Sequence, residues 1–226
     1  MRAVLENEQR SISAVYATVN GLDRIKDITR PGTAQTVEVT ASQLSKRLGN
    51  DAVHQGVMVQ TAPLVPPAFD EIVERSRAGR PLIVLDQVTD PHNVGAILRS
   101  AAAFDASAVI MTRRNSPPLD GALAKAASGA VEYVPVLLIA NLARELELLG
   151  KAGVLRIGLD GHAPQALETA EFRHPCALVL GAEHKGLRRL TAEKCDLLCR
   201  LTTPGPLKSL NVSNAAAVAL HTIMSR

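Results

Sequence analysis

The stretch ALVLGAEHKGLRRL, residues 177–190, changes character in its middle. Its first four residues, Ala177–Leu180, are apolar, as expected for a strand buried on both faces of a parallel sheet. Glu183, His184 and Lys185 then follow between two glycines, although charged groups without partners are costly to bury. The stretch therefore predicts a buried strand that ends in a sharp, charged loop. Because open parallel sheets bind ligands beyond the carboxyl ends of their strands, this loop is a candidate binding site.

Similar apolar runs occur before and after this strand in the sequence, and segments with a helical pattern separate them. The expected strands are PLIVLD (81–86), AVIMT (108–112), EYVPV (132–136), GVLRIGLD (153–160), CALVLG (176–181) and LLCRLT (197–202). The expected helices are NVGAILRSAAAF (93–104), GALAKAAS (121–128), NLARELELLG (141–150), LRRLTAEKCD (187–196) and NVSNAAAVALHTIM (211–224). This alternation predicts an α/β domain with a parallel sheet and helices on both of its faces.

The chain before this region predicts a separate, small α/β domain at residues 1–62. Its expected strands are AVYATV (14–19), TVEVT (36–40) and GVMVQT (56–61), and SQLSKRLG (42–49) is helix-like. A proline-rich linker at 63–80 follows, in which residues 68–78 can form a short helix. The larger domain then spans residues 81–226.

Composition excludes several classes of protein. Hydrophobic residues make up 46% of the chain and charged residues 21%, which is typical of a soluble globular protein. No apolar run approaches the ~18 residues that cross a membrane, and the first ten residues are too charged for a signal peptide, so we expect a cytoplasmic protein with no membrane partner. Cys176, Cys195 and Cys199 lack CxxC spacing, which favours reduced core thiols over disulfides or zinc ligands. The net charge of +3 permits a polyanionic partner without requiring one.

The helix expected at 93–104 carries two polar residues that its apolar stripe does not explain. Asn93 stands where an N-cap is expected. Arg99 lies off the stripe and shares a face with Gly95, a small residue that lets another backbone or a ligand approach closely. On its own, this segment favours the simpler interpretation, in which Asn93 only caps the helix and Arg99 is solvated.

Two other strand ends carry polar loops. The loop 181–187 lacks the spacing of a phosphate-binding P-loop, and by itself it could be a polar turn before a helix. In the loop that begins at Leu201, Ser209, Asn211 and Ser213 together exceed what capping of the next helix requires. The backbone N–H and C=O groups of these turns suit a polar ligand.

Together, the three loops resemble one protein family. Asn93–Arg99 (NVGAILR), Gly181–Leu187 (GAEHKGL) and Ser209–Ser213 (SLNVS), in this order and each after a predicted strand, are similar to the three motifs of the SpoU (TrmH-like) branch of the SPOUT RNA methyltransferases. The resemblance covers about residues 80–224. It implies a catalytic domain with a deep trefoil knot that binds S-adenosylmethionine, and a homodimer whose active sites are completed across the subunit interface.

The resemblance also implies site residues and a substrate. The catalytic candidates are Asn93, Arg99, Glu183, Ser209 and Asn211; the cofactor-binding candidates are Gly181, Ala182, Leu201, Thr202 and Leu210; no metal is implied. Arg99 would bind a phosphate and stabilise the developing alkoxide, and Glu183 would orient Arg99 or the ribose. Residues 1–62 resemble a ribosomal-protein-like RNA substrate-binding domain, shortened at its N-terminus. This layout is similar to that of bacterial enzymes that methylate a guanosine ribose of 23S rRNA, while tRNA ribose methylation is the alternative.

The chain departs from the family pattern at two places. Leu201-Thr202-Thr203 stands where Ile-Pro-Met is usual, and Asn214 replaces an apolar residue.

Two other functions remain open on the residues alone. A metal-dependent hydrolase could use Asp86, Asp90, His92 and His184, although HExxH spacing is absent. A catalytically silent RNA-binding protein could retain the same fold.

Overall fold

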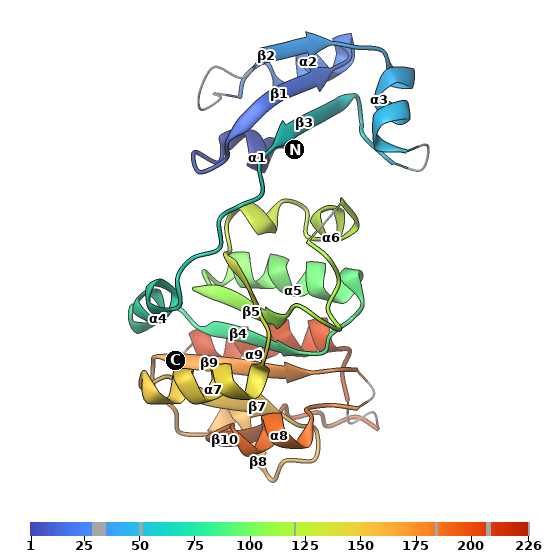
Figure 1. The fold of residues 1–226 in the computed structure, drawn as a ribbon. Coiled ribbons are helices and arrows are strands. Elements are labelled where there is room, and N and C mark those ends of the chain that lie inside the picture. The colour runs from blue at the N-terminus through green and yellow to red at the C-terminus, as the bar shows by residue number, and fades with distance from the viewer. Residues whose placement is uncertain (29–34, 50–51, 120, 184, 207–208, 226) are drawn as a thin grey trace. The chain divides into compact units, whose positions relative to one another are not determined.

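The computed structural model describes residues 1–28, 35–49, 52–119, 121–183, 185–206 and 209–225. Its chain forms two compact units, Met1–Val65 and Pro66–Arg226 (Figure 1). None of the helices in the described ranges is long and apolar enough to cross a membrane.

The first unit is a three-stranded sheet with three short helices. Its elements are α1 (Arg2–Glu6), β1 (Ile12–Ala17), α2 (Val19–Ile25), β2 (Gln35–Glu38), α3 (Ala41–Leu48) and β3 (Val57–Thr61). β1 lies between β2, to which it is parallel, and β3, to which it is antiparallel. The three predicted strands and the helix at 42–49 are confirmed within a few residues, whereas α1 and α2 were not predicted. Thr40 and Gln43 form a capping box that starts α3.

The second unit contains a parallel seven-stranded sheet, which confirms the predicted fold class. Its strands are β4 (Leu82–Asp86), β5 (Ala108–Thr112), β6 (Val136–Ile139), β7 (Leu155–Leu159), β8 (Gln165–Ala166), β9 (Cys176–Gly181) and β10 (Leu197–Arg200). Their order across the sheet is β6-β5-β4-β9-β7-β10-β8, and every pairing is parallel. The helices are α4 (Phe69–Arg77), α5 (Pro91–Ala103), α6 (Gly121–Ala126), α7 (Leu142–Lys151), α8 (Arg189–Glu193) and α9 (Val212–Met224), with short 3-10 turns at Ala130–Glu132 (η1) and Leu167–Thr169 (η2).

The sheet has an apolar core on each face. Along β4, Ile83 and Leu85 pack with α5, α6 and α9, whereas Leu82 and Val84 pack with α4 and α7. Because successive side chains of a strand point to opposite faces, a continuous apolar run is needed when helices cover both. α4 lies inside the linker expected at 63–80. Its buried Ile72 belongs to the core on the face of the sheet that carries Leu82 and Val84.

Two local predictions were wrong, and one strand was missed. The strand expected at 132–136 begins only at Val136, because the preceding residues form η1 and a turn. The helix expected at 187–196 is reduced to α8. The two-residue strand β8 carries no apolar run that would have revealed it.

The cysteines are free thiols. Burial raises the pKa of both Cys176 and Cys195 to about 12, so these thiols stay protonated near neutral pH. Their position in the apolar core agrees with the structural role expected from the sequence.

Gly95 allows α5 and α6 to approach closely. A Cβ atom at this position would lie 2.5 Å from the Cβ of Ala126 and 2.7 Å from its carbonyl carbon. The small face noted in the sequence therefore accommodates another backbone.

Gly95→Ala should lower the free energy of unfolding by about 1–3 kcal/mol, because overpacking forces one helix to shift. Chemical denaturation measures the loss. Gly205→Ala is the control, since its Cβ would meet no described atom within 4 Å. An equal loss at both positions would contradict this explanation.

Candidate active site

The three polar loops predicted from the sequence meet at the carboxyl edge of the sheet. One follows β4, one follows β9 and one follows β10, and the register pairs Asp86, the last residue of β4, with Gly181, the last residue of β9. Parallel strands end at the same edge of a sheet, so segments distant in sequence become neighbours there.

A hydrogen-bonded network of three side chains joins the loops. Glu183 Oε1 accepts hydrogen bonds from Asn93 Nδ2 at 2.5 Å and from Asn211 Nδ2 at 2.7 Å. Asn211 Nδ2 also donates to Asn93 Oδ1 at 3.1 Å. The structure thus brings together one polar residue from each predicted motif.

The position of Asn93 corrects the sequence analysis. The N-cap of α5 is Asp90, whose Oδ1 accepts from the backbone N–H of His92 at 2.9 Å, and Pro91 begins the helix. Asn93 therefore lies in the first turn, where the residue is only 7% exposed and its Nδ2 donates to Asp90 Oδ2 at 3.2 Å. Because Asp90 supplies the cap, the amide of Asn93 is available to Glu183.

Asn211 is held by its own helix. It is the N-cap of α9, and its Oδ1 accepts from the backbone N–H of Ser213 at 2.9 Å and from the Ser213 hydroxyl at 2.6 Å. These bonds turn the amide nitrogen of Asn211 toward Glu183. Asn211 is therefore both the cap of α9 and a member of the network.

The loop after β9 needs glycine at both ends. The Gly186 N–H donates to the Ala182 carbonyl at 2.8 Å, and the chain turns back so tightly that a Cβ at Gly181 would lie 2.1 Å from the Gly186 carbonyl carbon. Gly186 itself has a φ of +62°, a conformation that other residues rarely adopt. His184 lies outside the described residues.

An ion pair between a buried carboxylate and a half-exposed arginine anchors the far end of this loop. Asp86 is fully buried, and its Oδ1 accepts from Arg188 Nε at 2.7 Å while its Oδ2 accepts from the Arg188 backbone N–H at 3.0 Å. Asp86 is paired in the sheet with Gly181, where the loop begins. By binding Arg188, its carboxylate therefore holds the end of the loop close to its beginning.

An open cleft of about 660 Å³, including solvent at its mouth, lies beside the network. Among the predicted residues, those that line it are Gly181, Ala182, Glu183, Leu201, Ser209 and Leu210. The cleft is also lined by three residues that were not predicted: Leu159, which ends β7, and Asp160 and Gly161, which follow it. These could have been found only from the strand order, because β7 lies between β9 and β10.

Thr202 does not line the cleft. Its backbone N–H and its hydroxyl donate to the two carboxylate oxygens of Glu168 at 2.9 and 3.1 Å, while its neighbours Leu201 and Thr203 face the cleft. Burial disfavours the Glu168 carboxylate, but hydrogen bonds from Thr202 and from the Glu168 backbone, together with the charge of Arg200, outweigh burial and lower its pKa. This contact uses an N–H that proline, usual in the family at this position, lacks.

Arg99 stands apart from the network. It lies on an exposed face of α5, six residues beyond Asn93, and it does not line the cleft. Within the described ranges it makes no hydrogen bond or ion pair. A rise of about 1.5 Å per residue places it about 9 Å farther along the helix than Asn93.

The carboxylates of the metal-site alternative have other partners. Asp86 is paired with Arg188, and Asp90 caps α5. In the described part of the chain, no cluster of three or more His, Cys, Asp and Glu residues could hold a metal ion.

Comparison with known families decides the assignment. The model of the SpoU rRNA Methylase family matches residues 80–221, which contain all three loops and the whole network. The chain belongs to this family.

Individual proteins are also similar in sequence or fold to this SpoU methylase. It is 42% identical over 224 residues to the 23S rRNA (guanosine-2'-O-)-methyltransferase RlmB of Ralstonia nicotianae, covering 96% of this chain and 89% of that protein. It is 43% identical over 177 residues to RlmB of Pseudomonas aeruginosa, covering 77% and 71%. The crystal structure of the SpoU methyltransferase AviRb from Streptomyces viridochromogenes in complex with AdoMet superposes with a TM-score of 0.82 at 19% identity, covering 99% of this chain and 85% of that one.

The cleft of this SpoU methylase fits the cofactor that the family implies. Leu201 and Leu210 offer apolar surface, while Gly181 and Ala182 bring main-chain groups to the wall. Such a mixture suits an adenosyl group with a polar, charged tail.

Arg188→Met should lower the free energy of unfolding by about 3 kcal/mol, because the buried Asp86 carboxylate loses its cation. Arg189→Met is the matched control. Its ion pair with Glu193 is exposed, and its loss should cost less than ~0.5 kcal/mol. Chemical denaturation of both variants tests the difference, and equal stabilities would remove the anchoring role from Asp86.

Proposed function

We propose that this protein transfers a methyl group from S-adenosylmethionine to the ribose 2'-hydroxyl of a guanosine in 23S rRNA. The observation that carries the proposal is the Asn93–Glu183–Asn211 network at the rim of the cleft. The 42% identity to a 23S rRNA (guanosine-2'-O-)-methyltransferase over almost the whole chain supports the substrate.

The cofactor would lie in the cleft, held by Gly181, Ala182, Leu201 and Leu210. When bound, it supplies an electrophilic methyl group on its sulfonium. Thr202 would not contact the cofactor. Its hydrogen bonds to Glu168 would instead hold the backbone between the cleft residues Leu201 and Thr203 in place. The family resemblance adds a deep trefoil knot around this cleft, and we include it in the proposal.

Glu183 would position the ribose. Both amide donors reach its Oε1, which leaves Oε2 to accept a hydrogen bond from a hydroxyl. A ribose hydroxyl is a weak nucleophile near neutral pH, so in-line placement and help with its proton are both needed. Ser209, which lines the cleft, would add a hydrogen bond at the same edge.

Arg99 would stabilise the oxygen that attacks. Because arginine side chains are cationic, Arg99 would act by binding a phosphate and the developing alkoxide rather than as an ordinary base. Since Arg99 is remote from its own cleft, we propose a homodimer in which it serves the partner's site. A C2 dimer would then complete both sites in the same way.

The N-terminal unit would recognise the RNA. Its separate core and sheet suit an independent binding module, as the resemblance to ribosomal-protein-like domains implies. Because bacterial ribosomes are assembled in the cytoplasm, we propose that the protein acts there.

The direct test incubates the purified protein and S-adenosylmethionine with a 23S rRNA transcript and maps ribose methylation. One guanosine should become resistant to alkaline cleavage, because a 2'-O-methyl group removes the attacking hydroxyl. Transfer RNA is the control substrate. Methylation of tRNA alone would move the activity to the alternative substrate, and cofactor binding without methylation of either RNA would overturn the enzyme assignment.

Arg99→Ala should slow single-turnover methyl transfer by about 100-fold, the usual scale for losing a transition-state stabiliser. Stability should change by less than ~0.5 kcal/mol, because Arg99 is exposed. Arg99→Lys should rescue little, since lysine lacks the planar fork.

Shared sites predict complementation between inactive subunits. A mixture of Arg99→Ala and Glu183→Ala proteins, dissociated and reassembled, should regain about a quarter of wild-type activity, because half the dimers are mixed and each has one intact site. A mixture that forms mixed dimers but stays inactive would place Arg99 and Glu183 in the same subunit's site.

A further inference from the structure

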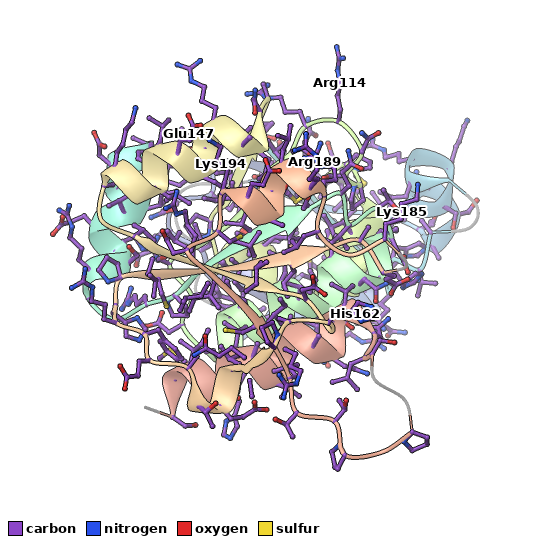
Figure 2. The ribbon with its side chains drawn as sticks, turned by 90° about the horizontal axis from the view of Figure 1, so that it is seen from below. Arg114, Glu147, His162, Lys185, Arg189 and Lys194 are labelled. Atoms are coloured by element: carbon purple, nitrogen blue, oxygen red, sulfur yellow. The ribbon has the colours of Figure 1, made fainter. Side chains whose placement is uncertain are left out.

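Two adjacent arginines stand at the end of β5, outside the cleft. Arg113 and Arg114 directly follow Thr112, the last residue of the strand, and both are exposed. Figure 2 shows the side chain of Arg114 extending away from the ribbon into solvent. Neither residue belongs to the three motifs, and the site described above does not use them.

The turn that carries these arginines is internally fixed. The Thr112 hydroxyl donates to the Arg114 carbonyl at 2.6 Å, and the Arg113 backbone N–H donates to the Ile139 carbonyl at 2.8 Å. Arg113 Nε donates to the Leu138 carbonyl at 3.3 Å, which orients its guanidinium while leaving other N–H groups available. These bonds therefore fix the Arg113 guanidinium and the backbone from which Arg114 extends.

The strand register places this turn beside the active site. β5 is parallel to β4 with Leu85 opposite Met111, so Thr112 stands next to Asp86, which in turn is opposite Gly181. Adjacent strands are about 4.8 Å apart, so Thr112 is about 10 Å from the start of the Glu183 loop. A chain of nucleotides that leaves the cleft over β4 would reach Arg113 and Arg114 next.

The two arginines are unneutralised cations in this region. Among the described residues, neither forms an ion pair, whereas Arg188 pairs with Asp86 and Arg189 pairs with Glu193. Positive charge at the edge of a site, without a carboxylate partner, attracts a polyanion. The net charge of the whole chain is only +3, so this attraction is local.

We propose that Arg113 and Arg114 bind backbone phosphates of the RNA strand next to the methylated nucleotide. This inference rests on the proposed function and adds a phosphate-binding surface to the methyltransferase unit itself. Arginine suits the role because its planar fork matches two phosphate oxygens. Phosphate contacts fix the register of a nucleic acid without reading its sequence, which would help place one ribose over Glu183.

The test measures affinity for a 23S rRNA transcript as a function of salt. Each lost phosphate contact should reduce the slope of log K against log[salt] by about 0.7–0.9, so Arg113→Gln/Arg114→Gln should reduce it by about 1.5. Arg113→Lys/Arg114→Lys should keep most of the slope, because the charges remain. S-adenosylmethionine affinity should be unchanged in both variants.

Arg173→Gln is the matched control. Arg173 is also exposed, but it precedes β9 at the opposite edge of the sheet. The inference is overturned if the double glutamine variant keeps the slope of the control. Polyglutamate is measured as a second polyanion. The inference is also overturned if the double glutamine variant loses affinity for polyglutamate but not for RNA, which would indicate an acidic protein partner. Failure of the wild-type protein to methylate RNA would instead contradict the proposed function.

Discussion

The Asp86 carboxylate is fully buried at the end of β4, and the shape of the site depends on its pairing with Arg188. A buried carboxylate without a partner is strongly unfavourable, so the folded chain must bring a cation to this point. Arg188 can reach it only if the chain between Gly181 and Gly186 turns back on itself, which requires glycine at both positions. The conformation of the loop that presents Glu183 therefore depends on the ion pair that the buried Asp86 carboxylate forms with Arg188.

The Asn93–Glu183–Asn211 network needs few side chains because both asparagines are already fixed by helix starts. Asn93 and Asn211 are both fixed by helix starts, one beside the cap residue Asp90 and one as the cap itself. Helix starts are rigid because their backbone N–H groups are satisfied by side chains. Two rigid amides then hold one flexible carboxylate, so the orientation of Glu183 is set before any ligand arrives.

Much of the fold and part of the site could be predicted from the sequence. The apolar runs indicated the buried strands of the large sheet, and the three polar strand ends indicated the residues that meet at its edge. The order of the strands could not be predicted, because apolar runs carry no information about neighbours in space. Leu159 and Gly161 were missed for that reason. Asn93 was assigned as the N-cap because sequence alone could not show that Asp90 already fills this position. The remoteness of Arg99 from the cleft depends on helix rise and orientation, which motif spacing does not reveal.

The contact between Glu168 and Thr202 connects two parts of the molecule with different expected mobility. Glu168 belongs to η2, directly after β8, a two-residue strand at the edge of the sheet. Edge segments with few ladder hydrogen bonds open more often than central strands. The wall of the cleft at Leu201 and Thr203 is connected to such a segment through Thr202. Local opening at the sheet edge and fluctuations in the width of the cleft should therefore be correlated motions. Ordering of either region would reduce the mobility of the other.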